Sequence, residues 1–285
     1  MPWRTGERVV APEATVEKLA GGFAFTEGPT CDADGNVLFT DQPNDRILKW
    51  SSTEGRLSTL LQPAGRANGM YFAPEGDLIA CADEKTALWS IAPDGRTTVL
   101  LDAYGNRALN GPNDVWVRPD GALYFTDPFY PRPWWTHDAM PQDGQHVYFL
   151  SADRQRLMRV ITDLTKPNGI IGTPDGRSLF VSDIEADQTY RYDIAPDGNL
   201  SGKTLVVEQG SDGMTLDDEG HLFLTGDGVM VFDSHGRQID HIRVPGEKWT
   251  ANVAFGGKDR QTLFITASTG LYGIRMRVRG ANAAK

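Results

Sequence analysis

Six residues with a side-chain oxygen recur along the chain at intervals of 40 to 55 residues. They are Glu27, Asn68, Asn113, Asn168, Asp212 and Asn252. Each stands eight residues before a turn position, so the six occupy one place in six copies of a single pattern. Carboxylate and amide oxygens are ligands for hard cations. If the six copies face a common axis, this set predicts a cation site.

The repeated pattern is clearest in residues 25–41. Two short β-runs flank an Asp-Gly turn, where Gly35 supplies the positive φ that a tight hairpin needs. The turn position returns at Gly76, Gly121, Gly176 and Gly220, and a degenerate sixth copy has Lys258-Asp-Arg260 there. Repeats of this length are typical of four-stranded blades. The expected fold class is all-β, a six-bladed β-propeller with a metal site in the central channel.

The polar residues could instead only cap the starts of strands by bonding their own backbone. The fixed offset across six copies favours the ring of ligands. Aspartates also end the second strand of the repeats, and for these the capping interpretation is preferred. They are Asp41, Asp83, Asp127, Asp183 and, more loosely, Asp227.

The repeats fill the sequence nearly end to end, which predicts one domain over residues 1–285. Residues 1–20 form a lead-in, from which residues 15–19 can supply an outer strand that closes the ring against the last blade. Residues 280–285 are expected to be a frayed tail. The longest spacing places an insertion at residues 128–144, on the same face as the polar ring. Its Trp134, Trp135 and His137 are candidate substrate-binding residues of a lid.

The net charge of −10 and the absence of a Lys/Arg run argue against a nucleic-acid partner and against binding to an anionic membrane. No apolar targeting or membrane-spanning segment is apparent, although a removed signal would leave no trace. Cys31 and Cys81 are expected to be unpaired, which suits a reducing compartment. We therefore expect a cytoplasmic protein, with no expectation about its oligomeric state.

The ring contains no histidine or cysteine, so its oxygen ligands favour Ca²⁺, with Mg²⁺, Mn²⁺ and Zn²⁺ as alternatives. Other catalytic signatures are absent: there is no His-Glu-x-x-His, no Gly-x-Ser-x-Gly and no phosphate-binding loop. The remaining chemistry is metal-assisted hydrolysis.

Several motifs resemble those of the senescence-marker-protein-30/gluconolactonase/luciferin-regenerating-enzyme family, and the resemblance covers nearly the whole chain. They are Phe25-Thr-Glu-Gly-Pro, Ala67-Asn-Gly, Gly111-Pro-Asn-Asp-Val, Tyr124-Phe-Thr-Asp-Pro, Lys166-Pro-Asn-Gly and Ser211-Asp-Gly-Met-Thr. The resemblance implies a six-bladed propeller with one divalent metal ion, commonly Ca²⁺, and lactone hydrolysis as the commonest activity.

Matched by motif, Glu27, Asn168 and Asp212 correspond to the family's metal ligands, and Asn113 corresponds to an Asn that contacts metal or substrate. Asp212 also matches the proposed catalytic acid/base. Asn68 lies in the ring outside the matched ligands and is expected to face the substrate. Animal members carry an arginine where this chain has Gly111, so sugar contacts at that point need not transfer.

The sequence thus predicts a metal-dependent lactonase that opens a sugar-type 1,4- or 1,5-lactone, with a small-molecule lactone as its partner. One alternative is hydrolysis of phosphotriesters on the same metal site. Another is a non-catalytic binding propeller, against which the cation ring and the absence of a Trp-Asp repeat argue.

Overall fold

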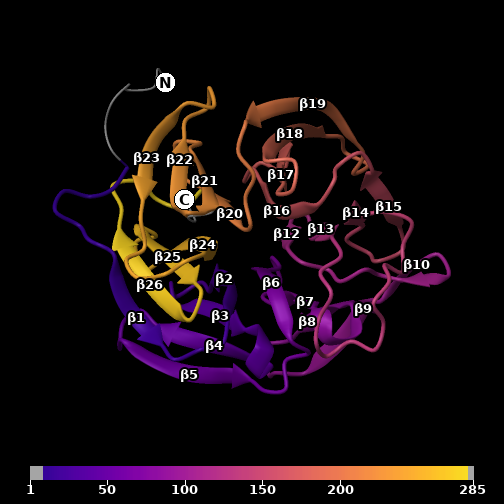
Figure 1. Cartoon of the computed structure of the whole chain (residues 1–285), viewed down its shortest axis with the longest axis horizontal. Helices are drawn as coiled ribbons and strands as arrows, with labels where there is room; N and C mark the ends of the chain where they lie inside the picture. Colours follow the sequence, from indigo (N-terminus) through magenta and orange to yellow (C-terminus); the bar gives the residue numbers. More distant parts are fainter. Residues whose placement is uncertain (1–8, 282–285) are drawn as a thin grey trace.

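Six antiparallel sheets, each of four strands, surround a central channel in the computed structural model, which describes residues 9–281 (Figure 1). The first blade contains β2 (Thr26–Cys31), β3 (Val37–Asp41), β4 (Arg46–Ser51) and β5 (Arg56–Leu61). The second contains β6 (Ala67–Phe72), β7 (Leu78–Ala82), β8 (Ala87–Ile91) and β9 (Thr97–Leu101). The third contains β12 (Val115–Val117), β13 (Leu123–Asp127), β14 (His146–Leu150) and β15 (Leu157–Ile161).

The fourth blade contains β16 (Pro167–Gly172), β17 (Ser178–Asp183), β18 (Gln188–Ile194) and β19 (Leu200–Val207). The fifth contains β20 (Met214–Leu216), β21 (Leu222–Gly226), β22 (Gly228–Phe232) and β23 (Gln238–Ile242). The sixth contains β24 (Thr250–Gly256), β25 (Thr262–Ala267), β26 (Gly270–Arg275) and β1 (Glu17–Gly21). A two-stranded hairpin, β10 (Ala103–Tyr104) with β11 (Arg107–Ala108), lies between the second and third blades. The predicted six-bladed propeller is confirmed.

The ring is closed by the N-terminal strand, as the sequence predicted. β1 pairs antiparallel with β26, from Glu17 opposite Gly273 to Gly21 opposite Gly270. The last sheet therefore combines the two ends of the described chain and needs no strand from elsewhere. The predicted tail lies outside the described residues from residue 282 onwards.

The first strand of each of the six repeats is innermost, and Figure 1 shows β2, β6, β12, β16, β20 and β24 toward the channel. The second and third strands form the middle of each blade, where neighbouring blades cover both of their faces. In β13 and β14, for example, every residue is buried. The core therefore consists of apolar layers between blades, which hold the innermost strands in fixed positions.

The turn chemistry predicted from the repeat is present in all six copies. The five turn glycines all have a positive φ, for example 84° at Gly35. Arg260 takes the equivalent position in the sixth turn, with a φ of 59°. Within residues 9–281, no helix is long and apolar enough to cross a bilayer. The two 3-10 helices there, Gln42–Asn44 and Asp83–Lys85, have three residues each.

Candidate functional site

Close contact between innermost strands explains why a glycine follows several of the ring residues. A Cβ atom placed on Gly28 would lie 2.1 Å from the backbone oxygen of Asn68, on the next strand around the channel. A Cβ atom on Gly213 would lie 1.9 Å from the amide carbon of Asn252. Any larger residue at these two positions would push neighbouring strands apart. The pattern that the sequence repeats is therefore a requirement for bringing the polar side chains together.

The innermost segment of the third blade departs from this pattern, because Asp114 takes the glycine position after Asn113. Its carboxyl fills the space beside Gly69, where a Cβ atom would lie 2.3 Å from Asp114 Oδ1. The backbone N–H of Gly69 donates to the backbone oxygen of Asn113 at 2.8 Å. This hydrogen bond joins the innermost segments of the second and third blades. Burial raises the pKa of Asp114 to about 7. Asp114 is thus a third acidic group close to the ring.

The two ring carboxylates are close enough to influence each other. Glu27 is buried, and its Oε2 accepts a hydrogen bond from the N–H of Gly28 at 2.8 Å. Burial, followed by the charge of Asp212, raises the pKa of Glu27 well above its usual range. Two such groups are stabilised in their charged forms by a cation between them.

Asp212 is half-buried, and its Oδ2 accepts a hydrogen bond from Trp249 Nε1 at 2.6 Å. Burial raises the pKa of Asp212 to about 6, while the hydrogen bond from Trp249 acts in the opposite direction. Trp249 lies in the segment before β24 and was not identified from the sequence. Its distance of 37 positions from Asp212 gives no sequence signal of the contact.

The ring amides leave acceptor atoms available for a cation. In the part of the chain that the structure describes, Asn68 Oδ1 and Asn168 Oδ1 are buried and have no hydrogen-bond partner. The Nδ2 of Asn168 donates to the hydroxyl of Tyr130 at 3.0 Å. The side-chain amide is therefore held through its nitrogen, not through its oxygen. Buried acceptors are rarely left unpaired, so these two oxygens indicate a missing positive partner.

The donor set therefore fits a hard cation. Among residues 9–281, no three His, Cys, Asp or Glu side chains form a cluster that could hold a metal ion. The ring instead combines two carboxylates with amide oxygens, which is a mixture that Ca²⁺ accepts. Asn113 is buried at the start of the third blade, while Asn252 places its amide beside the carboxyls of Glu27 and Asp114.

Buried threonines of the second strands hold the ring backbone in place. The hydroxyl of Thr126 donates to the backbone oxygen of Asn168 at 2.8 Å, across the boundary between two blades. Thr40 donates in the same way to the backbone oxygen of Asn68 at 3.3 Å. These threonines precede the strand-ending aspartates, so the Thr-Asp pair supports the ring from behind.

Most strand-ending aspartates are structural, as predicted. Their carboxylates accept backbone N–H groups from the segment that leads into the same blade: Asp41 from Ala24 and Phe25, Asp127 from Asn110 and Gly111, and Asp183 from Thr165 and Lys166. Asp83 differs, because its Oδ2 accepts the side chain of Gln42 at 3.0 Å and lies 2.8 Å from Arg132 Nε.

The insertion lies on the face where the ring opens, but its predicted residues are not those that reach the ring. Tyr130 makes that contact, through Asn168. Trp135 donates its indole N–H to the backbone oxygen of Asp83 at 2.8 Å and stacks on His137 with ring centres 4.9 Å apart. His137 is exposed. Trp135 and His137 therefore stack beside Asp83 and not on the ring residues.

Trp135 also occupies the space above Gly111. A Cβ atom on Gly111 would lie 2.8 Å from the indole ring of Trp135 and 3.0 Å from Asp83 Oδ1. The indole thus takes the room into which a longer side chain at position 111 would extend. Trp134 packs elsewhere, with the guanidinium of Arg66 4.6 Å from its ring centre.

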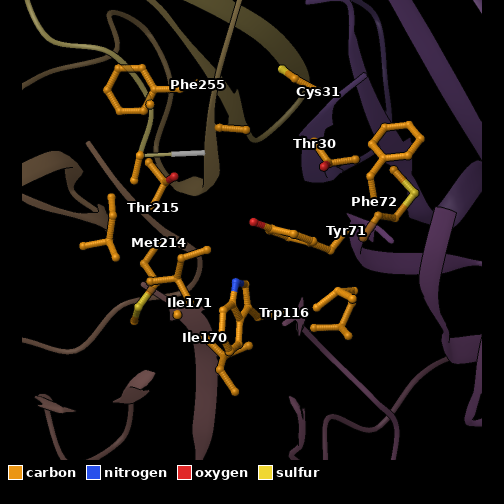
Figure 2. A pocket seen from close by; sticks show the side chains of 18 of the residues that line it. Thr30, Cys31, Tyr71, Phe72, Trp116, Ile170, Ile171, Met214, Thr215 and Phe255 are labelled. Carbon is orange, nitrogen blue, oxygen red and sulfur yellow. The ribbon is translucent and has the colours of Figure 1, made fainter. Parts of the chain in front are cut away.

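On the other side of the ring, the channel continues into a cavity of about 300 Å³. Its walls come from the later residues of the six innermost strands and are mostly apolar. Figure 2 shows the rings of Tyr71 and Trp116 extending toward its centre, with Ile171 and Phe255 among the other side chains around it. Asp114 and Asn252 line its inner end. The cavity therefore lies next to the polar ring, which contributes Asn252 to its wall.

Comparisons with known proteins agree with this fold. Residues 25–269 match the family model described as the SMP-30/Gluconolactonase/LRE-like region. A gluconolactonase of Zymomonas mobilis is 29% identical, with 93% of this chain and 82% of that protein covered. An X-ray structure of a protein assigned as a gluconolactonase is 33% identical, with a TM-score of 0.88 and 95% of both chains covered. A gluconolactonase structure from Xanthomonas campestris is 29% identical, with a TM-score of 0.86 and coverage of 94% of this chain and 91% of that one. The chain belongs to the SMP-30/gluconolactonase/LRE-like family.

Proposed function

We propose that this protein is a metal-dependent lactonase that opens a sugar-type 1,4- or 1,5-lactone. The observation that carries the proposal is the ring of two facing carboxylates, Glu27 and Asp212, beside two buried amide oxygens without hydrogen-bond partners. The gluconolactonase names of the similar proteins support the same reaction. The insertion contacts this ring through Tyr130, whose hydroxyl accepts a hydrogen bond from the amide of Asn168.

Glu27, Asn168 and Asp212 would hold the cation, with Asn113 beside it as a ligand or substrate contact. Ca²⁺ is the preferred ion because every donor is an oxygen and several are uncharged. When bound, such an ion polarises the lactone carbonyl and stabilises the negative charge that develops on its oxygen.

Asp212 is proposed as the acid/base. Opening the lactone requires water to add to the carbonyl carbon, the bond from that carbon to the ring oxygen to break, and the ring oxygen to leave as a hydroxyl. A single carboxylate can accept the proton of the water and return it to the leaving oxygen. Oδ2 of Asp212 accepts the hydrogen bond from Trp249, which restrains the orientation of the carboxylate. Asn68 would contact the substrate from the same ring.

The test compares Asp212→Asn with Asn68→Ala on a panel of lactones, measured by acid release during titrations of Ca²⁺, Mg²⁺, Mn²⁺ and Zn²⁺. Because general acid–base catalysis contributes about 10²–10⁴-fold, Asp212→Asn should lose at least that factor in kcat at saturating metal. Asn68→Ala should lose much less. If excess metal restores Asp212→Asn to near wild-type turnover, Asp212 is only a ligand. If chelation leaves turnover unchanged, the metal dependence is wrong.

A further inference from the structure

Arg132 of the insertion is anchored beside the ring but keeps part of its guanidinium available. Its Nε lies 2.8 Å from Oδ2 of Asp83, a carboxylate that is 2% exposed, and its own side chain is 21% exposed. Gln42 donates to the same carboxylate oxygen, so groups from three blades meet there. The pair with Asp83 is made through Nε, and within residues 9–281 neither Nη atom of Arg132 donates a hydrogen bond to the protein. The guanidinium is therefore held in position with free donors.

Asp83 is available for this contact because the repeat is altered at its blade. In three other repeats the equivalent aspartates, Asp41, Asp127 and Asp183, bind the backbone that leads into their own blades. Here Asp45 performs that task, since its Oδ1 accepts the N–H groups of Ala64 at 2.9 Å and Arg66 at 2.7 Å. The carboxylate of Asp83 is left to bind side chains, and its principal partner is the arginine of the insertion.

Other basic groups gather against the same part of the insertion. The ring of Tyr130 has Arg132 at 5.6 Å on its surface and the ammonium of Lys166 at 4.8 Å. Arg66 lies 4.6 Å from the ring centre of Trp134, and Arg132 lies 5.7 Å from it. Each of these cations also has a carboxylate partner: Asp83 for Arg132, Glu185 at 3.2 Å for Lys166 and Glu84 at 3.8 Å for Arg66. The Asp83 carboxylate is 2% exposed, whereas those of Glu185 and Glu84 are 56% and 42% exposed.

This basic group is near the ring in which the reaction is placed. Tyr130 connects Arg132 with Asn168: its ring centre lies 5.6 Å from the guanidinium, and its hydroxyl accepts a hydrogen bond from the amide of Asn168. Burial raises the pKa of Asp212, and the charge of Arg132 is among the influences that oppose this rise. A substrate whose carbonyl lies in the ring would extend toward Arg132 at its other end.

We propose that Arg132, assisted by Lys166, recognises an anionic group on the lactone, at the end of the substrate away from the carbonyl. The inference rests on the proposed function and names its substrate class. A guanidinium offers paired donors that match a carboxylate, phosphate or sulfonate. With Nε toward Asp83, the Nη donors are the ones that face this group. Gly111, which precedes β12, provides no positive charge, whereas Arg132 of the insertion does.

The test uses three lactones: neutral D-glucono-1,5-lactone, 6-phospho-D-glucono-1,5-lactone and the carboxylate D-glucaro-1,4-lactone. Wild type, Arg132→Gln, Arg132→Lys and the control Arg156→Gln are compared after subtraction of spontaneous hydrolysis. Arg156 also lies over an aromatic ring, 5.5 Å from the centre of Phe149, but it is exposed and lies in the turn between β14 and β15, at the end of β14 opposite the insertion. It reports the effect of losing one positive charge elsewhere.

Arg132→Gln should lower kcat/KM for at least one anionic lactone by about 10- to 100-fold, through KM, and change the neutral lactone by less than about threefold. Arg132→Lys should be intermediate, and Arg156→Gln should match wild type. The phosphate and carboxylate substrates show which anion is preferred. Equal losses on neutral and anionic lactones would reduce Arg132 to a clamp for the insertion and overturn the proposal.

A binding measurement separates this inference from the proposed reaction. Calorimetry with 6-phospho-D-gluconate and D-gluconate needs no turnover, so it applies even if no lactone is opened. Wild type should bind the phosphorylated acid more tightly, and Arg132→Gln should lose about tenfold or more of that preference. If the variant weakens both acids equally, or neither, anion recognition by Arg132 is wrong. If no lactone is hydrolysed but this difference remains, only the proposed reaction fails.

Discussion

Replacing Glu27 by glutamine should have opposite effects on stability with and without metal. Glutamine keeps the shape of the side chain and an oxygen that can accept the N–H of Gly28. It removes the charge, which in the metal-free protein is opposed by burial and by Asp212. The metal-free variant should therefore unfold at the same temperature as wild type or higher, because burying a charge without a partner is costly.

With metal the order reverses. Changing groups that only support a metal ligand already costs 10–100-fold in affinity, so losing a ligand carboxylate should cost roughly 100-fold or more. At a metal concentration about 100 times the wild-type Kd, this removes about 2 kcal/mol of the stabilisation by binding. For a chain of 285 residues that corresponds to a fall of about 3–4 °C in Tm.

The assay is thermal unfolding at pH 7 in chelator and in Ca²⁺, with metal affinity measured by calorimetry. Asp127→Asn is the control, because Asp127 is a buried carboxylate that accepts the N–H groups of Asn110 and Gly111 instead of facing Asp212. Its loss of stability should be the same in both conditions. The reasoning is refuted if Glu27→Gln is destabilised equally with and without metal, or if it gains as much from Ca²⁺ as wild type does.

Three further outcomes follow from the structure. Replacing both Trp134 and Trp135 by alanine should change the ranking of lactone substrates in activity assays more than it changes the Kd for metal. An unchanged ranking would show that these residues do not form a lid. Gly111→Ala should destabilise the protein by about 1–3 kcal/mol in urea unfolding, because its φ is 150° and the new Cβ would meet the indole of Trp135; wild-type stability would show that the indole moves freely. The guanidinium of Arg275 lowers the pKa of Asp259 to about 2. The ion pair therefore stabilises the folded state fully above the unfolded pKa near 4, and this contribution is lost as the pH falls through 2. Asp259→Asn should thus cost less than about 1 kcal/mol at pH 7, since the pair is half-exposed, and the difference should shrink from pH 4 to pH 2; a constant difference would exclude this ion pair as its cause.

The sequence by itself determined the features that repeat. The turn position returns in six copies, and each copy carries the alternation and turn chemistry of short antiparallel strands. These signals are local, so they can be recognised in the sequence without knowledge of distant contacts. The position of Glu27 and its five equivalents follows from them, because an equal place in each blade means an equal distance along the innermost strand. Even the closing strand β1 was predictable, since a ring of blades leaves the last sheet one strand short.

Only the tertiary structure decided what surrounds the ring. Residues 128–144 have no periodic pattern, and nothing local indicates that Tyr130 reaches Asn168 or that Arg132 is held by Asp83 on another blade. Trp249 bonds Asp212 only because the fifth and sixth blades are neighbours. Such contacts join residues from separate repeats, and the same turn and strand pattern is compatible with many of them. The repeat therefore specifies the ring, whereas packing between blades specifies which side chains stand at its mouth.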